Sequence, residues 1–278
     1  MPIFHEKKTI FSHNPKAGGT SVLDAVGFNK SNEFNPMNVF GYISTDNKNL
    51  DQKEYFDRHE AIPLYYEPSG AKIAHYFGFM KPMNNVLAQH LTKFETVNLF
   101  ERCYGNGTLT GYDSFTIIRN PYDRWISSLA MVGLFSLNSI DVLVNELSRH
   151  ITVMNTQWDF RLEVPHTHEI NVNYTLLNHP HVRPQHAWAE GVDNIFTLDN
   201  ADILLSRYLK EKDLICKDTK LERSNVEKSQ EYTDLKRRLL DLFPGRYDDF
   251  IKEFYAKDIQ LYEETLEKEK QLMSFQDD

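Results

Sequence analysis

The sequence predicts an α/β fold: a single domain with a mostly parallel central sheet flanked by helices. Three observations lead to this. Short β-rich apolar runs alternate with helical patterns, two of these runs pass through a turn directly into a helix, and no stretch reads as a domain linker or a repeat. With 278 residues, 41% of them hydrophobic, the chain can bury a sizeable core. We therefore expect one domain over residues 1–278.

The first predicted strand is Thr9–Ser12, an apolar run that stops at Asn14-Pro15. The segment PKAGGTS follows. After it, Val22, Leu23 and Val26 fall on one helical face. The pattern is a strand, a glycine turn and a helix.

Residues 30–70 are polar and broken by Asn, Pro and Gly, yet they include four tyrosines. We expect an irregular, ordered segment that could cover a substrate site. A second strand is predicted over Ala71–Ala74, leading into His75, and a helix over Asn84–Lys93.

The clearest strand is Ser114–Ile118, which ends in Arg119-Asn120-Pro121. Proline is tolerated at the first position of a helix, and the apolar stripe of Trp125, Ile126 and Leu129 continues from it. This repeats the pattern of strand, turn and helix.

The later elements are predicted from periodicity alone. They are a helix over Ser139–His150, a strand over Asn194–Leu198, a helix over Ala201–Lys210, and two helices around the Phe243–Gly245 break. Residues 246–278 are expected to form an acidic C-terminal helix. The stretch 253–278 holds eight acids and three lysines and is expected to be a solvated helix face.

The composition limits the partners and the compartment. Forty acidic and 31 basic residues give a net charge of −9, which argues against a nucleic-acid surface. Cys103 and Cys216 are far apart, which indicates a reducing compartment and no structural metal. No apolar stretch is long enough for a bilayer, and no signal peptide precedes the first turn. We expect a cytoplasmic protein with no membrane partner; its oligomeric state stays open.

Three candidate functional features follow predicted strands, where open parallel sheets bind ligands. They are Lys16 with the Gly18–Ser21 turn, His75, and Arg119. Glycine lets the backbone approach an anion, and helix-start N–H groups point towards it. The alternative is an ordinary tight turn with a solvated lysine. A Walker A loop needs its lysine after the glycines, whereas here it precedes them.

At these residues the chain resembles a known family. PKAGGTS resembles the 5′-phosphosulfate loop of sulfotransferases that use 3′-phosphoadenosine 5′-phosphosulfate (PAPS), and RNPYDRWISS resembles their 3′-phosphate motif. AHYFGF at 74–79 is similar to a segment of the carbohydrate 2-O-sulfotransferase branch, although Ala74 departs from the usual Gly. Segments 183–188, 223–229 and 255–262 also look like that branch.

The resemblance implies a P-loop-like phosphosulfate turn after the first strand, PAPS as cofactor and 3′,5′-adenosine bisphosphate as product, with no metal required. It implies His75 as general base and Lys16 as the group that neutralises the leaving phosphate oxygen. The implied cofactor-binding residues are Lys16, Ala17, Gly18, Gly19, Thr20, Ser21, Arg119 and Ser127.

Each of these residues also has a structural alternative. Arg119 could pair with Asp123 as a surface salt bridge, and His75 could be a core or capping histidine. Asp123 and Arg124 are expected to be structural and Trp125 to be a core residue. Ser128 points about 100° away from Ser127 on a helix, so we favour Ser127 alone.

The remaining polar candidates are expected to be surface or loop residues. The histidines could be imagined as metal ligands, but they lack cysteine companions. Arg183 and Gln185 could reach a substrate or merely bond a loop, and Asn225 could help position a ligand. The histidines are His166, His168, His179, His181 and His186.

The leading hypothesis is a PAPS-dependent sulfotransferase acting on a hydroxyl of a small molecule or short glycan; an amine acceptor stays open. One alternative is a nucleotide kinase or hydrolase of P-loop type, and another is a non-catalytic nucleotide-binding protein. The acidic balance opposes a long basic groove for sulfated polymers.

Overall fold

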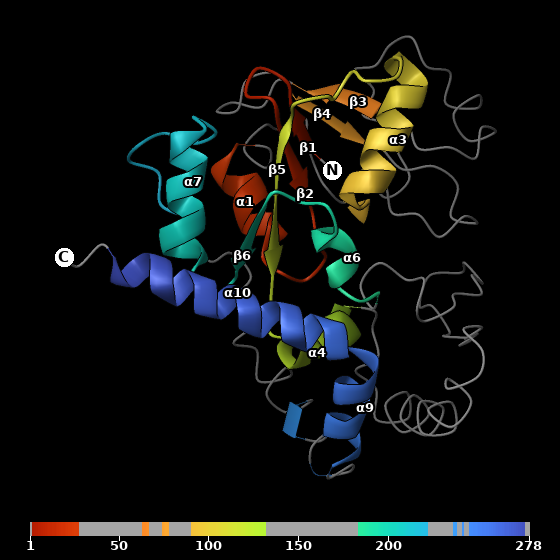
Figure 1. Ribbon diagram of the computed structural model, residues 1–278, viewed down its shortest axis with the longest axis vertical. Coiled ribbons are helices and arrows are strands. Elements are labelled where there is room, and N and C mark those ends of the chain that lie inside the picture. Colours follow the sequence, from red (N-terminus) through yellow and green to blue (C-terminus); the bar gives the residue numbers. More distant parts are fainter. Residues whose placement is uncertain are drawn as a thin grey trace.

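The computed structural model describes residues 2–27, 63–66, 74–77, 90–131, 183–221, 236–237, 241 and 245–275. Within them, six strands form one sheet in the order β3-β4-β1-β2-β5-β6 (Figure 1). The strands are β1 Pro2–Phe4, β2 Thr9–Ser12, β3 Pro63–Tyr66, β4 Ala74–Phe77, β5 Asp113–Ile118 and β6 Asn194–Thr197. The protein is thus a mixed α/β protein.

The sheet is mixed in direction. The β2–β5 and β5–β6 pairs are parallel, whereas β1 is antiparallel to both β2 and β4, and β3 is antiparallel to β4. Strand β4 therefore runs the same way as β2, β5 and β6. Four of the six strands share one direction, but most neighbouring pairs are antiparallel, so the prediction of a mostly parallel sheet is confirmed only in part.

The strand predictions hold best in the parallel half. Thr9–Ser12 is confirmed at both ends, and the other two predicted strands there are right to within one residue. The prediction for Ala71–Ala74 is wrong in its bounds, because β4 begins at Ala74. Strand β1, which was not predicted, forms a hairpin with β2 through a turn in which Lys8 N donates to His5 O at 3.1 Å.

Helices cover both faces of the sheet (Figure 1). Helices α1 and α7, the latter preceded by a π-helical turn η5, lie on one side, and α3 lies on the other. The helices are α1 Gly19–Ala25, α3 Lys93–Tyr104, α4 Pro121–Met131, α6 His186–Ala189, η5 Ala201–Leu205, α7 Ser206–Glu211, α9 Arg246–Phe254 and α10 Ala256–Ser274. The predicted Ala201–Lys210 helix corresponds to η5 and α7.

Each face has its own apolar core. On the α1 side, Phe11 and Phe115 stack at 4.7 Å between ring centroids and pack against Val22 and Leu205. On the α3 side, Ile3 and Ile10 pack against Phe100. The alternation of side chains along β2 sends Ile10 and Phe11 to opposite faces, so this short strand contributes to both cores.

Helix α3 was not predicted, although a local signal marks its start. Thr92 and Glu95 form a capping box: Thr92 Oγ1 accepts from Glu95 N at 3.2 Å, and Glu95 Oε2 accepts from Thr92 N at 2.8 Å. The sequence T-x-x-E is the known signature of this arrangement. The predicted Asn84–Lys93 helix lies mostly outside the described residues.

The C-terminal segment differs from the single acidic helix expected over 246–278. After the expected break at Gly245, α9 ends at Phe254 and α10 begins at Ala256. Helix α10 crosses the molecule past the arrowhead end of β5 (Figure 1). Its face is only partly solvated, since Asp258 and Glu269 are almost fully buried.

The predicted helix Ser139–His150 and nearly all of segment 30–70 lie outside the described residues. In the part of the chain that the structure describes, no helix combines the length and apolarity needed to cross a bilayer.

Candidate anion-binding site

The segment after β2 turns sharply before α1 begins. Lys16 has a left-handed φ of 61°, and Gly18, the N-cap of α1, has a φ of 93°. A non-glycine residue in this region is uncommon. Gly18 has no side chain with which to cap the helix start, and the first N–H groups of a helix have no partner within it. The turn can therefore offer backbone donors at Gly19 and Thr20.

The side chains of the turn differ in what they can reach. Lys16 is half-buried, Thr20 is exposed, and Ser21 is buried. Ala17 belongs to the apolar core beneath the turn, so only its backbone could serve a ligand. Of the turn residues named from the sequence, Lys16 and Thr20 have side chains at the surface.

The two glycines are packed from below by other side chains. A Cβ on Gly18 would lie 2.6 Å from Leu198 Cδ1, in β6's following loop. A Cβ on Gly19 would overlap the imidazole of His13. Gly19 is therefore required by close packing against His13, whereas Gly18 is required by its left-handed backbone conformation.

His13 lies beneath the turn and was not among the site residues predicted from the sequence. Its ring stacks on Phe11 at 5.2 Å and meets the ring of His90 edge-on at 4.7 Å. Burial lowers the pKa of His13 to about 3, because a charged imidazole cannot be solvated there. His13 is thus a neutral ring beneath the turn.

Arg119 meets the turn from the neighbouring strand. It follows the last residue of β5, and β2 and β5 are parallel neighbours with Ser12 opposite Thr116. The guanidinium Nη1 of Arg119 donates to the Lys16 carbonyl at 3.4 Å. Two segments 103 residues apart therefore meet at one edge of the sheet, as their positions after two strands predict.

Helix α4 carries the other residues of the second motif. Ser127 is buried, and Ser128 donates to the Arg124 carbonyl at 2.9 Å within the helix. Trp125 is a core residue, which confirms that prediction. The partner that the structure shows for Asp123 is Lys236, at 3.0 Å, rather than Arg119.

Arg124 has a structural role, as expected, but deep inside the protein. Its Nε donates to the Pro15 carbonyl at 3.0 Å, and its guanidinium lies 5.6 Å from the centre of the Trp188 ring. Burial lowers its pKa, an effect that the Asp258 carboxylate partly offsets. This cation supports the turn from beneath.

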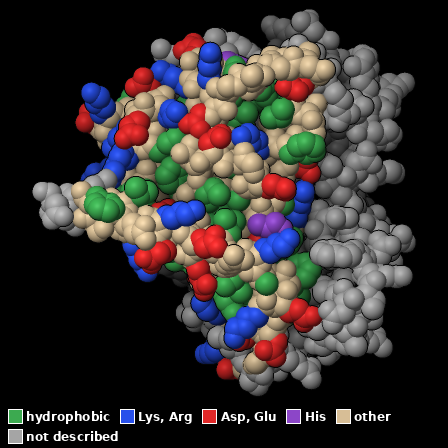
Figure 2. Space-filling view, viewed as in Figure 1, with side chains coloured by type: hydrophobic (Ala, Val, Ile, Leu, Met, Phe, Trp, Pro, Cys, Tyr) green, Lys and Arg blue, Asp and Glu red, His purple; other side chains and the backbone are tan. Residues whose placement is uncertain are grey.

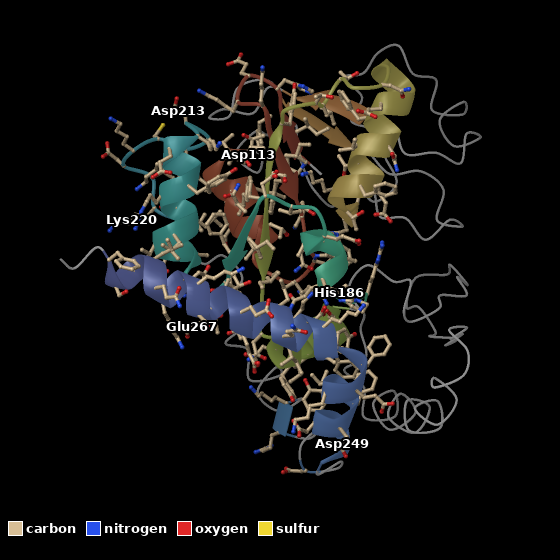
Figure 3. All side chains as sticks on the ribbon, in the orientation of Figure 1. Asp113, His186, Asp213, Lys220, Asp249 and Glu267 are labelled. Carbon is tan, nitrogen blue, oxygen red and sulfur yellow. The ribbon has the colours of Figure 1, made fainter. Side chains whose placement is uncertain are left out.

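The loop residues Arg183, Gln185 and His186 also have defined partners. Arg183 pairs with Glu95 at 2.8 Å, and His186 Nδ1 bonds the buried Asp258 at 2.7 Å, at the junction of α6 and α10 (Figure 3). Gln185 bonds the backbone of Arg119. In the described ranges, no group of three His, Cys, Asp or Glu residues could hold a metal ion.

His75 lies within a strand and not beyond its carboxyl end, which corrects the expectation from the sequence. It pairs with Ile3, which in turn pairs with Ile10 of β2. His75 is therefore level with a residue that is two positions, about 7 Å, before the end of β2, and it lies two strands, about 10 Å, across the sheet from that residue. The remaining candidates His166, His168, His179, His181 and Asn225 lie outside the described residues.

Comparison with known proteins adds no assignment. No family model matches the chain, and neither a curated protein nor a solved structure matches it significantly.

Proposed function

We propose that this chain is a PAPS-dependent sulfotransferase that transfers a sulfuryl group to a hydroxyl of a small molecule or short glycan. The observation that carries the proposal is the contact between Arg119 Nη1 and the Lys16 carbonyl, at 3.4 Å. It joins the two segments that resemble the phosphate-binding motifs of that family. Two independent sequence motifs thus converge at the edge where open sheets bind nucleotides.

The residues present fit a nucleotide with phosphate groups at both ends of its ribose. Lys16 and the backbone N–H groups at the start of α1 suit the 5′-phosphosulfate, because cations and helix starts attract anions. Arg119 offers a planar fork of donors for the 3′-phosphate. Ser127, two turns along α4, is the companion hydroxyl that the resemblance assigns, although its side chain is buried in this structure.

The transfer requires alignment and charge neutralisation. PAPS supplies the sulfuryl group, whose bond to the phosphate oxygen breaks as the acceptor oxygen bonds to sulfur. Lys16 neutralises the charge that develops on the departing phosphate oxygen. His75 accepts the proton of the acceptor hydroxyl, since a neutral imidazole suits that role near neutral pH.

The surface charge favours a neutral or cationic acceptor. Among the described residues on the face shown in Figure 2, acidic and basic side chains are interspersed and form no continuous basic patch. The chain as a whole carries −9. A densely sulfated polymer would be repelled by such a surface, whereas a small hydroxyl compound or a short neutral glycan would not.

Calorimetric titration with 3′,5′-adenosine bisphosphate tests the proposal. Lys16→Ala and Arg119→Ala should each weaken binding about tenfold or more, since each removes a charge-assisted hydrogen bond. Lys7→Ala is the matched control, because Lys7 pairs with Asp213 at the opposite end of β2. Binding that is absent, or unchanged in both site variants, would contradict the proposal.

Two further measurements separate the alternatives. Tight, magnesium-dependent binding of ATP would favour the P-loop kinase or hydrolase. Radiolabelled PAPS incubated with a panel of hydroxyl and amine acceptors would separate an enzyme from a nucleotide-binding protein without activity. A labelled product that disappears in Lys16→Ala supports transfer by this site.

A further inference from the structure

The side-chain amide of Gln185 is completely buried and forms hydrogen bonds with both the backbone N–H and the backbone C=O of Arg119. Gln185 Oε1 accepts from Arg119 N at 3.0 Å, and Gln185 Nε2 donates to Arg119 O at 2.7 Å. Arg119 is the first residue after β5, so the amide continues the pairing that a neighbouring strand would supply. The Gln185 side chain thus pairs with the backbone N–H and C=O of Arg119 just after the end of β5, as the backbone of a neighbouring strand would.

The same amide is connected to the end of β2. Asn14 Nδ2 donates to Gln185 Oε1 at 3.3 Å and to the Ile117 carbonyl at 2.9 Å. Asn14 is two residues before Lys16 and is itself buried. Two buried amides therefore tie the ends of β2 and β5 together, directly beneath Lys16 and Arg119.

A buried carboxylate in α10 fixes the position of Gln185. Asp258 Oδ2 accepts from Gln185 N at 2.7 Å, and Oδ1 accepts from His186 N at 2.9 Å. The imidazole of His186 bonds the same Oδ1, and Figure 3 shows His186 beside α10. Because Asp258 is fully buried and bonded on both oxygens, the turn at Gln185 has little freedom to move.

We propose that Gln185 is a positioning residue of the nucleotide site: it holds the backbone of Arg119 so that the guanidinium faces the Lys16 turn. This inference rests on the proposed function. Gln185 has no exposed surface, so it acts through Arg119 and does not touch the nucleotide. Asp258 holds Gln185 in turn.

The arrangement matters because the direction of a long side chain depends on its backbone. A displacement of about 1 Å at a binding group can cost about a hundredfold in function. Without the amide, the N–H and C=O of Arg119 lose buried partners and move to find others. The 3′-phosphate would lose its donor fork even though the arginine is still present.

If Gln185 were only structural, its loss would lower the stability of the protein and affect the binding of all ligands alike. The test therefore compares two nucleotides. Wild type, Gln185→Met and Arg119→Ala are titrated with 3′,5′-adenosine bisphosphate and with adenosine 5′-monophosphate, which lacks the 3′-phosphate. Gln185→Met keeps the side-chain size and removes all three bonds. Gln260→Met is the control, because Gln260 is exposed on α10 and its side chain donates to Glu264 Oε1 on the same helix, at 2.8 Å.

In Gln185→Met we expect the preference for the bisphosphate to fall about tenfold, with adenosine 5′-monophosphate affinity changed less than about twofold. The double variant Gln185→Met/Arg119→Ala should prefer the bisphosphate over the monophosphate as much as Arg119→Ala alone does. If Gln185 acts through Arg119, the effects of the two substitutions on this preference do not add. If Gln185→Met lacks a cooperative thermal transition, Gln185→Glu, which keeps the shape and an acceptor but loses the donor, takes its place.

The outcomes are distinguishable. Three results would overturn the role of Gln185 and leave the proposed function standing. Gln185→Met could prefer the bisphosphate as strongly as the wild type does, or it could lose equal affinity for both nucleotides. The third result is a double variant whose loss of preference equals the sum of the two single losses. A wild type that does not bind the bisphosphate overturns both. A selective, non-additive loss supports the positioning role.

Discussion

The imidazole of His13 fills the space in which Gly19 would carry a side chain. A Cβ built on Gly19 would lie 1.9 Å from Nε2 and 2.1 Å from Cδ2 of His13, closer than real Cβ atoms approach other atoms. His13 follows β2 directly, and Gly19 is the first residue of α1. The strand end and the helix start are therefore in direct contact through one ring, and the shape of the turn between them depends on it.

Gly19→Ala should destabilise the protein and weaken bisphosphate binding. Gly19 does not have a positive φ, so the cost is steric, about 1–3 kcal/mol for a small-to-large change in a packed site. His13→Ala opens the space for the new methyl group. The double variant should therefore lose less free energy of unfolding than the two single variants lose together. Urea unfolding of the four proteins measures this coupling; strict additivity would show that His13 does not fill the Gly19 site.

The burial of His13 should make stability depend on pH. Its pKa is lowered to about 3 in the folded state, against 6.5 in the absence of burial. Between these two pKa values, the His13 imidazole is protonated in the unfolded chain and neutral in the folded chain. The free energy of unfolding therefore falls as the pH drops from about 6.5 towards 3. Between pH 7 and pH 5 we expect a loss on the order of 2 kcal/mol from this group.

Urea unfolding at both pH values, repeated on His13→Gln, checks this expectation. The variant has no titrating ring and should lose less stability on acidification than the wild type. Equal losses in the two proteins would show that His13 is protonated in the folded state.

The buried carboxylates of α10 should contribute more to stability than its exposed ones. Glu269 accepts from Thr197 N at 2.7 Å and from Asn200 Nδ2 at 2.9 Å, just as Asp258 accepts from the turn at Gln185. Asp258→Asn and Glu269→Gln each replace one acceptor oxygen by a donor, leaving a buried donor unpaired. We expect a loss of about 1–3 kcal/mol for each in urea unfolding.

Glu263→Gln is the control for both, because Glu263 is exposed on the same helix. It should change the free energy of unfolding by less than about 0.5 kcal/mol. A control as damaging as Asp258→Asn would show that the charge of α10, and not its buried bonds, sets the effect.

His75→Ala tests the proposed base. If His75 takes the proton of the acceptor, the variant should lose about a hundredfold or more in turnover. Its affinity for 3′,5′-adenosine bisphosphate should stay within about threefold of the wild type, because the proposed nucleotide contacts lie in other segments. Turnover with labelled PAPS and calorimetry on the same samples provide the two readouts. Unimpaired turnover would exclude His75 as the base.

The parallel part of the fold could be predicted from local patterns. Strands β2, β5 and β6 are apolar, β-rich and bounded by turn residues, so their limits were right to within one residue. Strand β1 is only three residues long and carries no readable alternation. The break at Tyr255 between α9 and α10 has no proline or glycine to mark it.

The supporting residues of the site could not be predicted in the same way. Gln185 and Asp258 form hydrogen bonds with residues more than 60 positions away in the sequence. No local sequence pattern around either residue indicates those partners. Arg124 was expected to be structural, but nothing near it in the sequence indicates that it is buried against Trp188. Only packing between distant segments decides which polar side chains are buried.

The sequence by itself determined the elements on both sides of the turn and the chemistry that the turn offers: a lysine, two glycines, and an arginine after a second strand. These are local properties, set by backbone freedom and side-chain type. The tertiary structure decided what holds them together. Long-range contacts bring Arg119 to Lys16, bury His13 under Gly19, and let Asp258 and Gln185 fix the end of β5, because each requires atoms that only folding makes neighbours.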